Sequence, residues 1–403
     1  MVSRRRAIFA TFALAACSPR ALLTPSLVNP SHAGAHANSP SSTRAFAFLD
    51  RMMDLYGAGD ALRLAQSFVP TKALRLGATA FTYDQAVLIA AYLARGTSDD
   101  LARARVLGNS LEYAQSHDPA GDGRVRNAYW VRPFVSQGGK VTFAGAGTDT
   151  GNMAWTGIAL AQLYGATHEA THLTAATAIA NWIAQNAADS RGPGGYTGGT
   201  NVRWKSTEHN IDVYAFFTML AALTSDSSWS TGAASALALV DAMWNARSGF
   251  YWIGTLDDGA TPNRVPIPED VQTWSFLATE RTIYEASLDW AAKRLAVNEG
   301  GFRGVSFSDA DRSGVWFEGT AHLAAALLAR AKAGDRQKAV AYLGDLAYAQ
   351  RHAPNADGDG IDAASKNGLR TGDGDSYYAC LHVGATAWYA LAALASNPLR
   401  LLQ

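Results

Sequence analysis

The sequence predicts an all-α fold, a single-domain toroid of six helical hairpins called an (α/α)6 barrel. Apolar residues recur at helical spacing in about twelve blocks, and no comparable run alternates as a strand would. Short turns alternate regularly with long glycine-rich connections, so consecutive helices pair into hairpins. The predicted helices span residues 43–57, 83–95, 99–117, 151–166, 169–188, 207–224, 228–246, 270–279, 281–297, 317–333, 335–352 and 377–395.

The composition is that of a globular protein whose charges balance. Of the 403 residues, 48% are hydrophobic and 17% are charged, which is ample for one large core. Lys plus Arg and Asp plus Glu each number 34, so no excess positive field exists to bind a nucleic acid. The chain also has 11 Trp and 15 Tyr, whose rings can stack on flat apolar faces such as those of sugars.

Residues 1–17 predict an export signal. Three arginines, Arg4 to Arg6, resemble a twin-arginine signal and precede an apolar run that is too short to span a bilayer. Leu14-Ala15-Ala16-Cys17 resembles a lipobox, so a lipid anchor at Cys17 and an ordinary signal cleavage nearby stand as alternatives. We therefore expect a periplasmic, cell-surface or secreted protein whose only membrane attachment is that anchor.

The proline-containing segment 18–42 predicts a flexible linker, and 43–403 the barrel domain. Only Cys17 and Cys380 are present, so lipidation or removal of Cys17 leaves no disulfide partner, and cysteine-based zinc sites are excluded. We expect a monomer that needs no metal or cofactor. The segment 355–362 has the alternating oxygen ligands of a calcium loop, but Lys366 stands where the bidentate Glu is expected.

The long connections identify the functional face. In a toroid, the short turns lie on one rim and the long loops on the other, where they lead into the inner helices. The helices entered from long loops are the more continuously apolar ones, as expected of an inner ring. The long connections are 118–150, 189–206, 247–269, 298–316 and 353–376.

Every predicted inner-helix start carries a carboxylate. Helix N-termini attract Asp and Glu through capping and the helix dipole, which accounts for each one singly. Their convergence on one rim suggests a catalytic site as well. The candidate catalytic residues are Asp84, Asp149, Glu208, Asp212, Asp270 and Glu318.

Glu208 is the predicted general acid. Glu208 and Asp212 are four residues apart and share a helix face, where two like charges raise the pKa of one of them. Cleavage of a glycosidic bond needs such an acid and a second carboxylate that acts as base or nucleophile. We favour Asp149 for that second role, with the other candidates left open.

Aromatic and polar residues at the same helix starts are candidates for substrate binding. Glycines around 194–199 let the backbone approach a ligand, and the indoles near the helix starts can stack on sugar rings. The predicted substrate-binding residues are Tyr83, Asn152, Trp155, Trp204, His209, Gln272, Trp274, Trp316 and Tyr377.

With these residues in view, the chain resembles the six-hairpin glycosidase superfamily. The segments that carry the resemblance are FTYDQA, TDTGNMAW, KSTEHNIDVYAFF, EDVQTW and GVWFEGTA, and the likeness covers about residues 43–397. It implies an (α/α)6 barrel with activity on carbohydrates and names no substrate.

Three functional hypotheses follow. The first is a glycoside hydrolase acting on a poly- or oligosaccharide by carboxylate acid/base catalysis. The second is a polysaccharide lyase with His209 or Tyr214 as base, whose uronic acid substrate would need a positive cleft. The third is a non-catalytic glycan-binding lipoprotein. The cations available for a positive cleft are Arg126, Arg132, Arg203 and Lys205.

Overall fold

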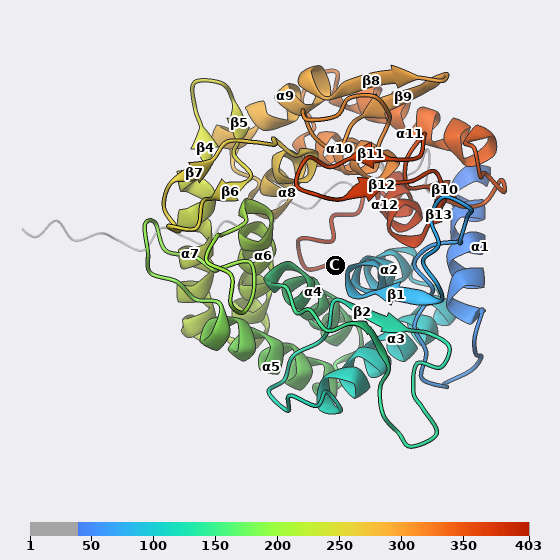
Figure 1. Cartoon of the computed structure of the whole chain (residues 1–403), viewed down its shortest axis with the longest axis vertical. Helices are drawn as coiled ribbons and strands as arrows, with labels where there is room; N and C mark the ends of the chain where they lie inside the picture. Colours follow the sequence, from blue (N-terminus) through green and yellow to red (C-terminus); the bar gives the residue numbers. More distant parts are fainter. Residues whose placement is uncertain (1–38, 403) are drawn as a thin grey trace, which may run out of the picture. The chain divides into compact units, whose positions relative to one another are not determined.

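In the computed structural model, which describes residues 39–402, twelve α-helices form two concentric rings (Figure 1). Each inner helix contacts the next, and the last contacts the first, so the inner ring is closed. The inner helices are α2 (Thr82–Arg95), α4 (Thr150–Thr167), α6 (Thr207–Thr224), α8 (Glu269–Thr279), α10 (Phe317–Arg330) and α12 (Val383–Ala393). The outer helices are α1 (Pro40–Asp54), α3 (Ser98–Ser116), α5 (Ala170–Asn186), α7 (Ser227–Ala242), α9 (Ala286–Arg294) and α11 (Asp335–His352).

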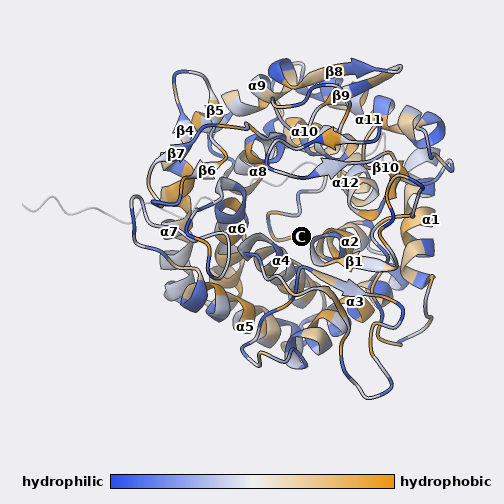
Figure 2. Ribbon diagram, viewed as in Figure 1, coloured by the Kyte–Doolittle hydropathy of each residue, from blue (hydrophilic) through white to orange (hydrophobic). Residues whose placement is uncertain are grey.

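This arrangement confirms the predicted six-hairpin toroid. Helices α3, α5, α7, α9 and α11 each pack on the inner helix that precedes them, and α1 packs on α12 to complete the sixth pair. Hydrophilic residues gather on the loops and the outer ring (Figure 2), whereas every residue of α12 is buried. The predicted export signal and Cys17 lie outside the described residues.

Three helix starts differ from the prediction, and one of them is that of α9, which begins at Ala286 rather than at residue 281 because Thr282–Tyr284 form a short 3-10 helix before it. Helix α1 begins at Pro40, inside the predicted linker, because Ser39 caps it and proline suits a first helical turn. Helix α12 begins at Val383 rather than 377, because the residues before it pair as short strands. Ser376–Tyr377 (β12) pairs with Leu369–Arg370 (β11), and Leu381–His382 (β13) pairs with Ile361–Asp362 (β10).

The remaining strands are also short and antiparallel, and they form one three-stranded sheet and three pairs in the connections that lead to the inner helices. Their presence on this rim holds the loops over the inner-helix starts. They are β1 (Thr79–Phe81), β2 (Ala128–Trp130), β3 (Phe143–Gly145), β4 (Trp244–Asn245), β5 (Phe250–Tyr251), β6 (Gly254–Thr255), β7 (Pro262–Asn263), β8 (Ala296–Glu299) and β9 (Phe302–Val305).

One contact recurs at all six inner helices. The residue four positions after the N-cap accepts a hydrogen bond from a backbone N–H of the preceding loop, and in five of the six cases it also donates to the carbonyl of the cap. We call this contact the loop clamp. The clamp residues and the N–H groups they bind are Gln85 with Ala65, Met153 with Val125, Asn210 with Tyr196, Gln272 with Tyr251, Thr320 with Val305 and Thr386 with Ile361.

The far end of the barrel is crossed by the C-terminal segment 397–402. Gln162 of α4 donates to the carbonyls of Pro398 and Arg400 and accepts from the Leu402 N–H, while Asn397 donates to Leu277 of α8. Segment 397–402 therefore lies near the centre of the ring (Figure 1), and the inner-helix starts lie at the opposite rim, which we call the mouth. The helices of residues 39–402 all fall short of the length and apolarity that a membrane span requires.

Candidate active site

The inner helices present two layers of side chains toward the barrel axis. The upper layer lies two positions after the N-cap and includes Tyr83, Glu208, Asp270 and Glu318. The lower layer lies four residues further along each helix, on the same face. It consists of Val87, Trp155, Asp212, Trp274, His322 and Trp388.

Ring contacts show that the lower layer meets on the axis. Trp155 and Trp274 have ring centroids 5.1 Å apart, and Trp388 lies 5.9 Å from Trp274 and 4.3 Å from His322. All four rings are at most 3% exposed, so they form a closed aromatic floor under the mouth. Asp212 is embedded in this floor beside Trp155.

Glu208 is partly exposed at the mouth, and its side chain makes no hydrogen bond with any described residue. Its pKa lies above the usual value. Burial is the main cause, the neighbouring His209 opposes it, and the charges of Asp373 and Asp149 reinforce it. The predicted general acid therefore has both the access and the shifted pKa that the role requires.

Asp212 lies one helical turn below Glu208 and is fully buried. Neither of its carboxylate oxygens has a partner with ordinary hydrogen-bond geometry among the described residues, although the Trp155 indole is close enough to lower its pKa. Burial and the charges of Glu208 and Asp270 hold its pKa well above the usual range. The sequence-based pairing of Glu208 with Asp212 thus appears in the structure as two neighbouring carboxyl groups on one face of α6.

Asp270 supplies a third carboxyl group, from the start of α8. One oxygen accepts the Val271 N–H at 2.6 Å, and the side chain is 5% exposed. Burial, Glu208 and Glu269 raise its pKa well above the ordinary value. Asp270 therefore belongs to the same electrostatic group as Glu208 and Asp212.

Glu318 is held differently, inside a network with two histidines. Tyr83 donates to one of its oxygens at 2.7 Å, His322 Nε2 lies 3.7 Å from the same oxygen, and His382 Nδ1 lies 3.4 Å from the other. Burial would raise the pKa of Glu318, but His322, His382 and Tyr83 outweigh it and bring the pKa below the usual value. Glu318 is therefore an ionised, fully engaged carboxylate.

Each histidine of the network also faces a second carboxylate. His382 Nε2 lies 3.1 Å from Asp84, and His322 Nδ1 lies 3.3 Å from Glu269. Burial lowers both histidine pKa values, but the carboxylates on either side outweigh it and raise them. Asp84 is thereby assigned to a buried ion-pair network between α2 and α12 rather than to the open mouth.

Asp149 is the N-cap of α4 and stands at the edge of the mouth. Its Oδ2 accepts a 2.6 Å hydrogen bond from Asn127, whose own side-chain oxygen accepts the Asp149 N–H. Asn152, one turn into α4, is partly exposed and its side chain makes no hydrogen bond with a described residue. Both predicted residues therefore border the same opening as Glu208.

Tyr377 also reaches the mouth, although from the β11–β12 hairpin instead of a helix start. Burial, Glu318, Asp270 and Glu208 raise its pKa well above the ordinary value, which places its hydroxyl among these carboxylates. Its ring packs against Trp316 with centroids 5.4 Å apart. Asp373, in the same loop, is exposed, and its charge helps to raise the pKa of Glu208.

Three of the four tryptophans predicted to stack on sugars are packed instead. Trp155, Trp274 and Trp316 are 1–3% exposed and present no free face, whereas Trp204 is 39% exposed. The indole of Trp204 lies on Gly198, where an added Cβ would come within 2.1 Å of the ring. Helix starts bring a tryptophan near the mouth, but its position along the turn decides whether it faces solvent or the floor.

Gln272 was predicted to bind substrate, and the structure corrects that. Its side chain is fully buried, accepts the Tyr251 N–H at 2.8 Å, and donates to the carbonyls of Tyr251 and Pro268. All of its hydrogen-bonding groups are used in the loop clamp. Gln272 therefore anchors the loop before α8 and has no group left for a ligand.

The residues proposed for a lyase do not gather at the mouth. Lys205 is buried with its Nζ held by the carbonyls of Arg191 and Gly194, and Arg126 is paired with Asp118. Tyr214 lies near Arg281 and contributes to the raised pKa of that residue, which pairs with Asp241 of the outer helix α7. Only His209 stays close to Glu208.

Several site residues were missed by sequence reasoning. His322, His382 and Trp388 lie at the centre of the structure, but the sequence places two of them inside a helix whose start was misjudged. Glu269, beside the predicted Asp270, is fully buried and keeps one oxygen without a partner. The signal that could have found His322 is its spacing of four residues from Glu318.

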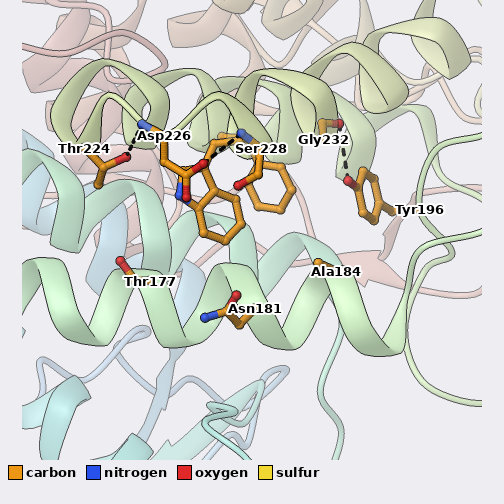
Figure 3. Close-up of a pocket in the computed structure, with 10 residues that line it drawn as sticks. Thr177, Asn181, Ala184, Tyr196, Thr224, Asp226, Ser228 and Gly232 are labelled. Carbon is orange, nitrogen blue, oxygen red and sulfur yellow. Dashed lines mark hydrogen bonds between the residues drawn. The ribbon is translucent and has the colours of Figure 1, made fainter.

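Two further features lie away from this centre. A groove of about 400 Å³ opens between α5 and α7 (Figure 3), with Asn181 on one side and Trp229 on the other, and no predicted site residue lines it. In the calcium-like loop, Arg51 pairs with Asp357 and Asp359, with a 3.1 Å contact to the latter. Within residues 39–402 no cluster of His, Cys, Asp and Glu has the arrangement of a metal site.

Comparison with solved structures shows the fold: the chain shares the (α/α)6-barrel architecture of several carbohydrate-active enzymes. A family 76 glycoside hydrolase (mannosidase) of Bacteroides thetaiotaomicron is 12% identical, with a TM-score of 0.62 over 88% of this chain and 98% of that one. An inactive variant of an α-1,6-mannanase from Salegentibacter sp., in complex with α-1,6-mannotriose, is 15% identical, with a TM-score of 0.58 over 89% and 99%.

A D-mannose isomerase is equally similar, with 13% identity and a TM-score of 0.63 over 89% of this chain and 98% of that chain. No protein-family model matches the sequence, and no curated protein matches it in a sequence search. At these identities the likeness concerns the fold, so the activity has to be argued from the site itself.

Proposed function

We propose that this protein is a glycoside hydrolase acting on an oligo- or polysaccharide, with Glu208 as general acid and Asp149 as the second carboxylate. The observation that carries the proposal is Glu208 itself, an accessible and unbonded carboxyl group whose pKa is raised by burial and by neighbouring carboxylates. A carboxyl group whose pKa is raised keeps its proton to a higher pH than usual and can donate it to the leaving oxygen of a glycoside.

Asp149 is suited to the complementary role. It is partly exposed, its charge is felt by Glu208, and a 2.6 Å hydrogen bond from Asn127 fixes its orientation. The other carboxylates fit less well, since Asp270 has a pKa raised well above the usual value and Glu318 is fully engaged by Tyr83 and the histidines. Whether Asp149 acts as base or nucleophile depends on its separation from Glu208 across the sugar.

The environments of His322 and His382 argue against either of them as the base of a sugar isomerisation, which leaves His209 as the histidine that such a reaction would have to use. Transfer of a proton between neighbouring sugar carbons needs a base that touches the substrate. His322 is fully buried and enclosed by Trp274, Trp316 and Trp388, with ring centroids 4.3–5.2 Å away. His382 is 3% exposed and stacks on Phe68 at 4.1 Å. Both histidines are therefore enclosed, and each contacts buried carboxylates.

The rim above the site supports a carbohydrate substrate. Trp204 and Trp130 are 39% and 42% exposed, and both lie in loops that lead to inner-helix starts. The indole of Trp204 lies against Gly198 and one edge of the Trp130 indole lies near Gly77, and both rings keep exposed surface on which a sugar ring can stack. For location, we propose export directed by residues 1–17, in agreement with an extracellular or periplasmic glycan as substrate.

The test is hydrolysis of a broad panel of polysaccharides, measured by release of reducing ends, with wild-type protein and the Glu208→Gln variant. We expect kcat to fall by about 10²–10⁴ in the variant, because the proton donor is lost while the shape is kept. Asp149→Asn should cause a loss of similar order.

Glu280→Gln is the matched control, since Glu280 is half exposed at the opposite end of α8. Its activity should equal that of the wild type. Hydrolysis that survives Glu208→Gln in a folded protein, as judged by circular dichroism, would contradict the proposal.

A further inference from the structure

A hairpin from the loop before α12 covers part of the mouth. Its strands β11 and β12 carry the turn 371–375, and Figure 1 shows this hairpin, in red, inside the outer ring with its turn toward α8. Ser308 Oγ donates a 2.6 Å hydrogen bond to the Thr371 carbonyl. Gly372 lies against Pro266, where an added Cβ would come within 3.0 Å of the proline ring. The turn therefore rests on the loops that precede α8 and α10.

The turn also reaches toward the opposite side of the ring. Helices α12 and α6 face each other across the closed ring of six inner helices. Even so, the charge of Asp373 in the turn helps to raise the pKa of Glu208, at the start of α6. Tyr377, at the base of the hairpin, packs against Trp316 with ring centroids 5.4 Å apart. We call residues 371–377 the hairpin wall.

The two halves of the mouth differ in exposure. On the side of the hairpin wall, Asp270, Glu318 and His382 at the starts of α8, α10 and α12 are buried. On the other side, the exposed indoles Trp130 and Trp204 lie in the loops that lead to α4 and α6. The starts of α2, α4 and α6 also carry partly exposed side chains, which are Tyr83, Asp149, Asn152, Glu208 and His209. The mouth is therefore covered on one half and open on the other.

We propose that the protein attacks glycans at a chain end, because the hairpin wall stops the chain just beyond Glu208. The rest of the chain lies over the open half, where the indoles Trp130 and Trp204 offer surfaces for stacking. In each turnover, water is added across one glycosidic bond near the chain end, and a short fragment of constant size is released. The inference rests on the proposed hydrolase function and adds its mode of attack.

The test uses chains with blocked ends. Linear hexasaccharides of mannose, glucose, galactose and N-acetylglucosamine are offered to the full-length protein in three forms. One is free at both ends, one carries a bulky benzylidene acetal on its non-reducing unit, and one carries a biphenylmethyl aglycone at its reducing end. We expect one of the two blocks to prevent cleavage and the other to be tolerated, because only one end of the chain meets the wall.

A shortened hairpin locates the effect. A variant in which Asn-Gly replaces residues 371–375 keeps β11 and β12 paired through a two-residue turn. It should cleave both blocked forms at internal bonds and release fragments of several sizes. Gly300→Asn, in the turn between β8 and β9, is the matched control, since this hairpin packs on the outer helix α11 and asparagine tolerates the φ of 60° at Gly300. Its products should equal those of the wild type.

The outcomes separate this inference from the proposed activity. Cleavage of both blocked forms by the wild type sustains the hydrolase and overturns attack at a chain end, whether or not the shortened variant folds. Unchanged products from a folded shortened variant overturn the role of the hairpin wall.

If no chain is cleaved, binding of the same hexasaccharides is measured by NMR. Binding of a free chain that is lost with only one of the two blocks sustains recognition of a chain end and refutes the hydrolase. Equal binding of all three forms, or binding of none, refutes both.

Discussion

Replacing Gln272 by methionine should weaken the fold while leaving the affinity for substrate unchanged. The side chain of Gln272 makes three hydrogen bonds of 2.8–3.1 Å to the backbone of Tyr251 and Pro268, and all are buried. Methionine fills a similar volume but neither accepts the Tyr251 N–H nor donates to the two carbonyls.

The magnitude follows from these groups. One buried N–H left without its partner costs roughly 1–3 kcal/mol, and the loss of two further bonds adds about 1 kcal/mol each. The free energy of unfolding should therefore fall by about 3–5 kcal/mol, a large fraction of the 5–15 kcal/mol typical of a domain.

Urea unfolding followed by circular dichroism measures this, with the midpoint lowered and the slope unchanged. Gln337→Met on the exposed face of α11 is the matched control and should shift stability by less than about 0.5 kcal/mol. If Gln272→Met keeps its stability but raises KM, then Gln272 binds substrate and the clamp reasoning is refuted.

Two further predictions concern the mouth. Because the general acid must be protonated, activity is present below the pKa of Glu208 and is lost as the pH rises through it. Asp373→Asn removes a charge that raises this pKa and should move the alkaline limb of the kcat profile to lower pH, whereas His209→Gln should move it to higher pH. Shifts in the same direction would argue against Glu208 as the acid. Trp204→Ala should raise KM for oligosaccharides about tenfold with kcat nearly unchanged, and an unaltered KM would rule out stacking there.

The ring of hairpins could be predicted because it depends on periodicity and loop length, both of which are visible in a sequence. The helical spacing of apolar residues gave boundaries within a few residues for most helices, for example 207–224 for α6. The start of α12 could not be placed, because the pairing of 376–377 and 381–382 with distant strands leaves no local signal. As a consequence, His382 was hidden inside a predicted helix rather than recognised at its N-cap.

The site could be predicted only in part, because the position of each helix cap is not visible in the sequence. A sequence shows that a residue lies near a helix start, but the direction of its side chain depends on its exact distance from the cap. Glu208 and Asp212 were grouped correctly because a spacing of four is independent of the cap. Gln272 and Trp274 were assigned to the ligand because they follow a carboxylate closely, yet one faces the loop and the other the floor.

The loop clamp and the catalytic layers are two consequences of one geometry. Successive residues of an α-helix are rotated by about 100°, so the residue four positions after the cap lies about 200° from the one two positions after it, on the opposite face. The residue six positions after the cap returns to within about 40° of the axis-facing direction. Fixing Gln272 or Asn210 to the loop outside the ring therefore also fixes Asp270, Glu208 and Asp212 toward its centre.

This coupling explains how the protein tolerates carboxylates that lack partners. Burial of a carboxylate without hydrogen-bond partners costs free energy, so a rotation of the helix that exposed Asp212 to water would lower that cost. The clamp opposes that rotation with two or three buried hydrogen bonds in each of α6 and α8. The hydrogen bonds of the clamp thus offset the free-energy cost of burying carboxylates on the same helix. Weakening a clamp should therefore disorder the carboxylates before it unfolds the ring.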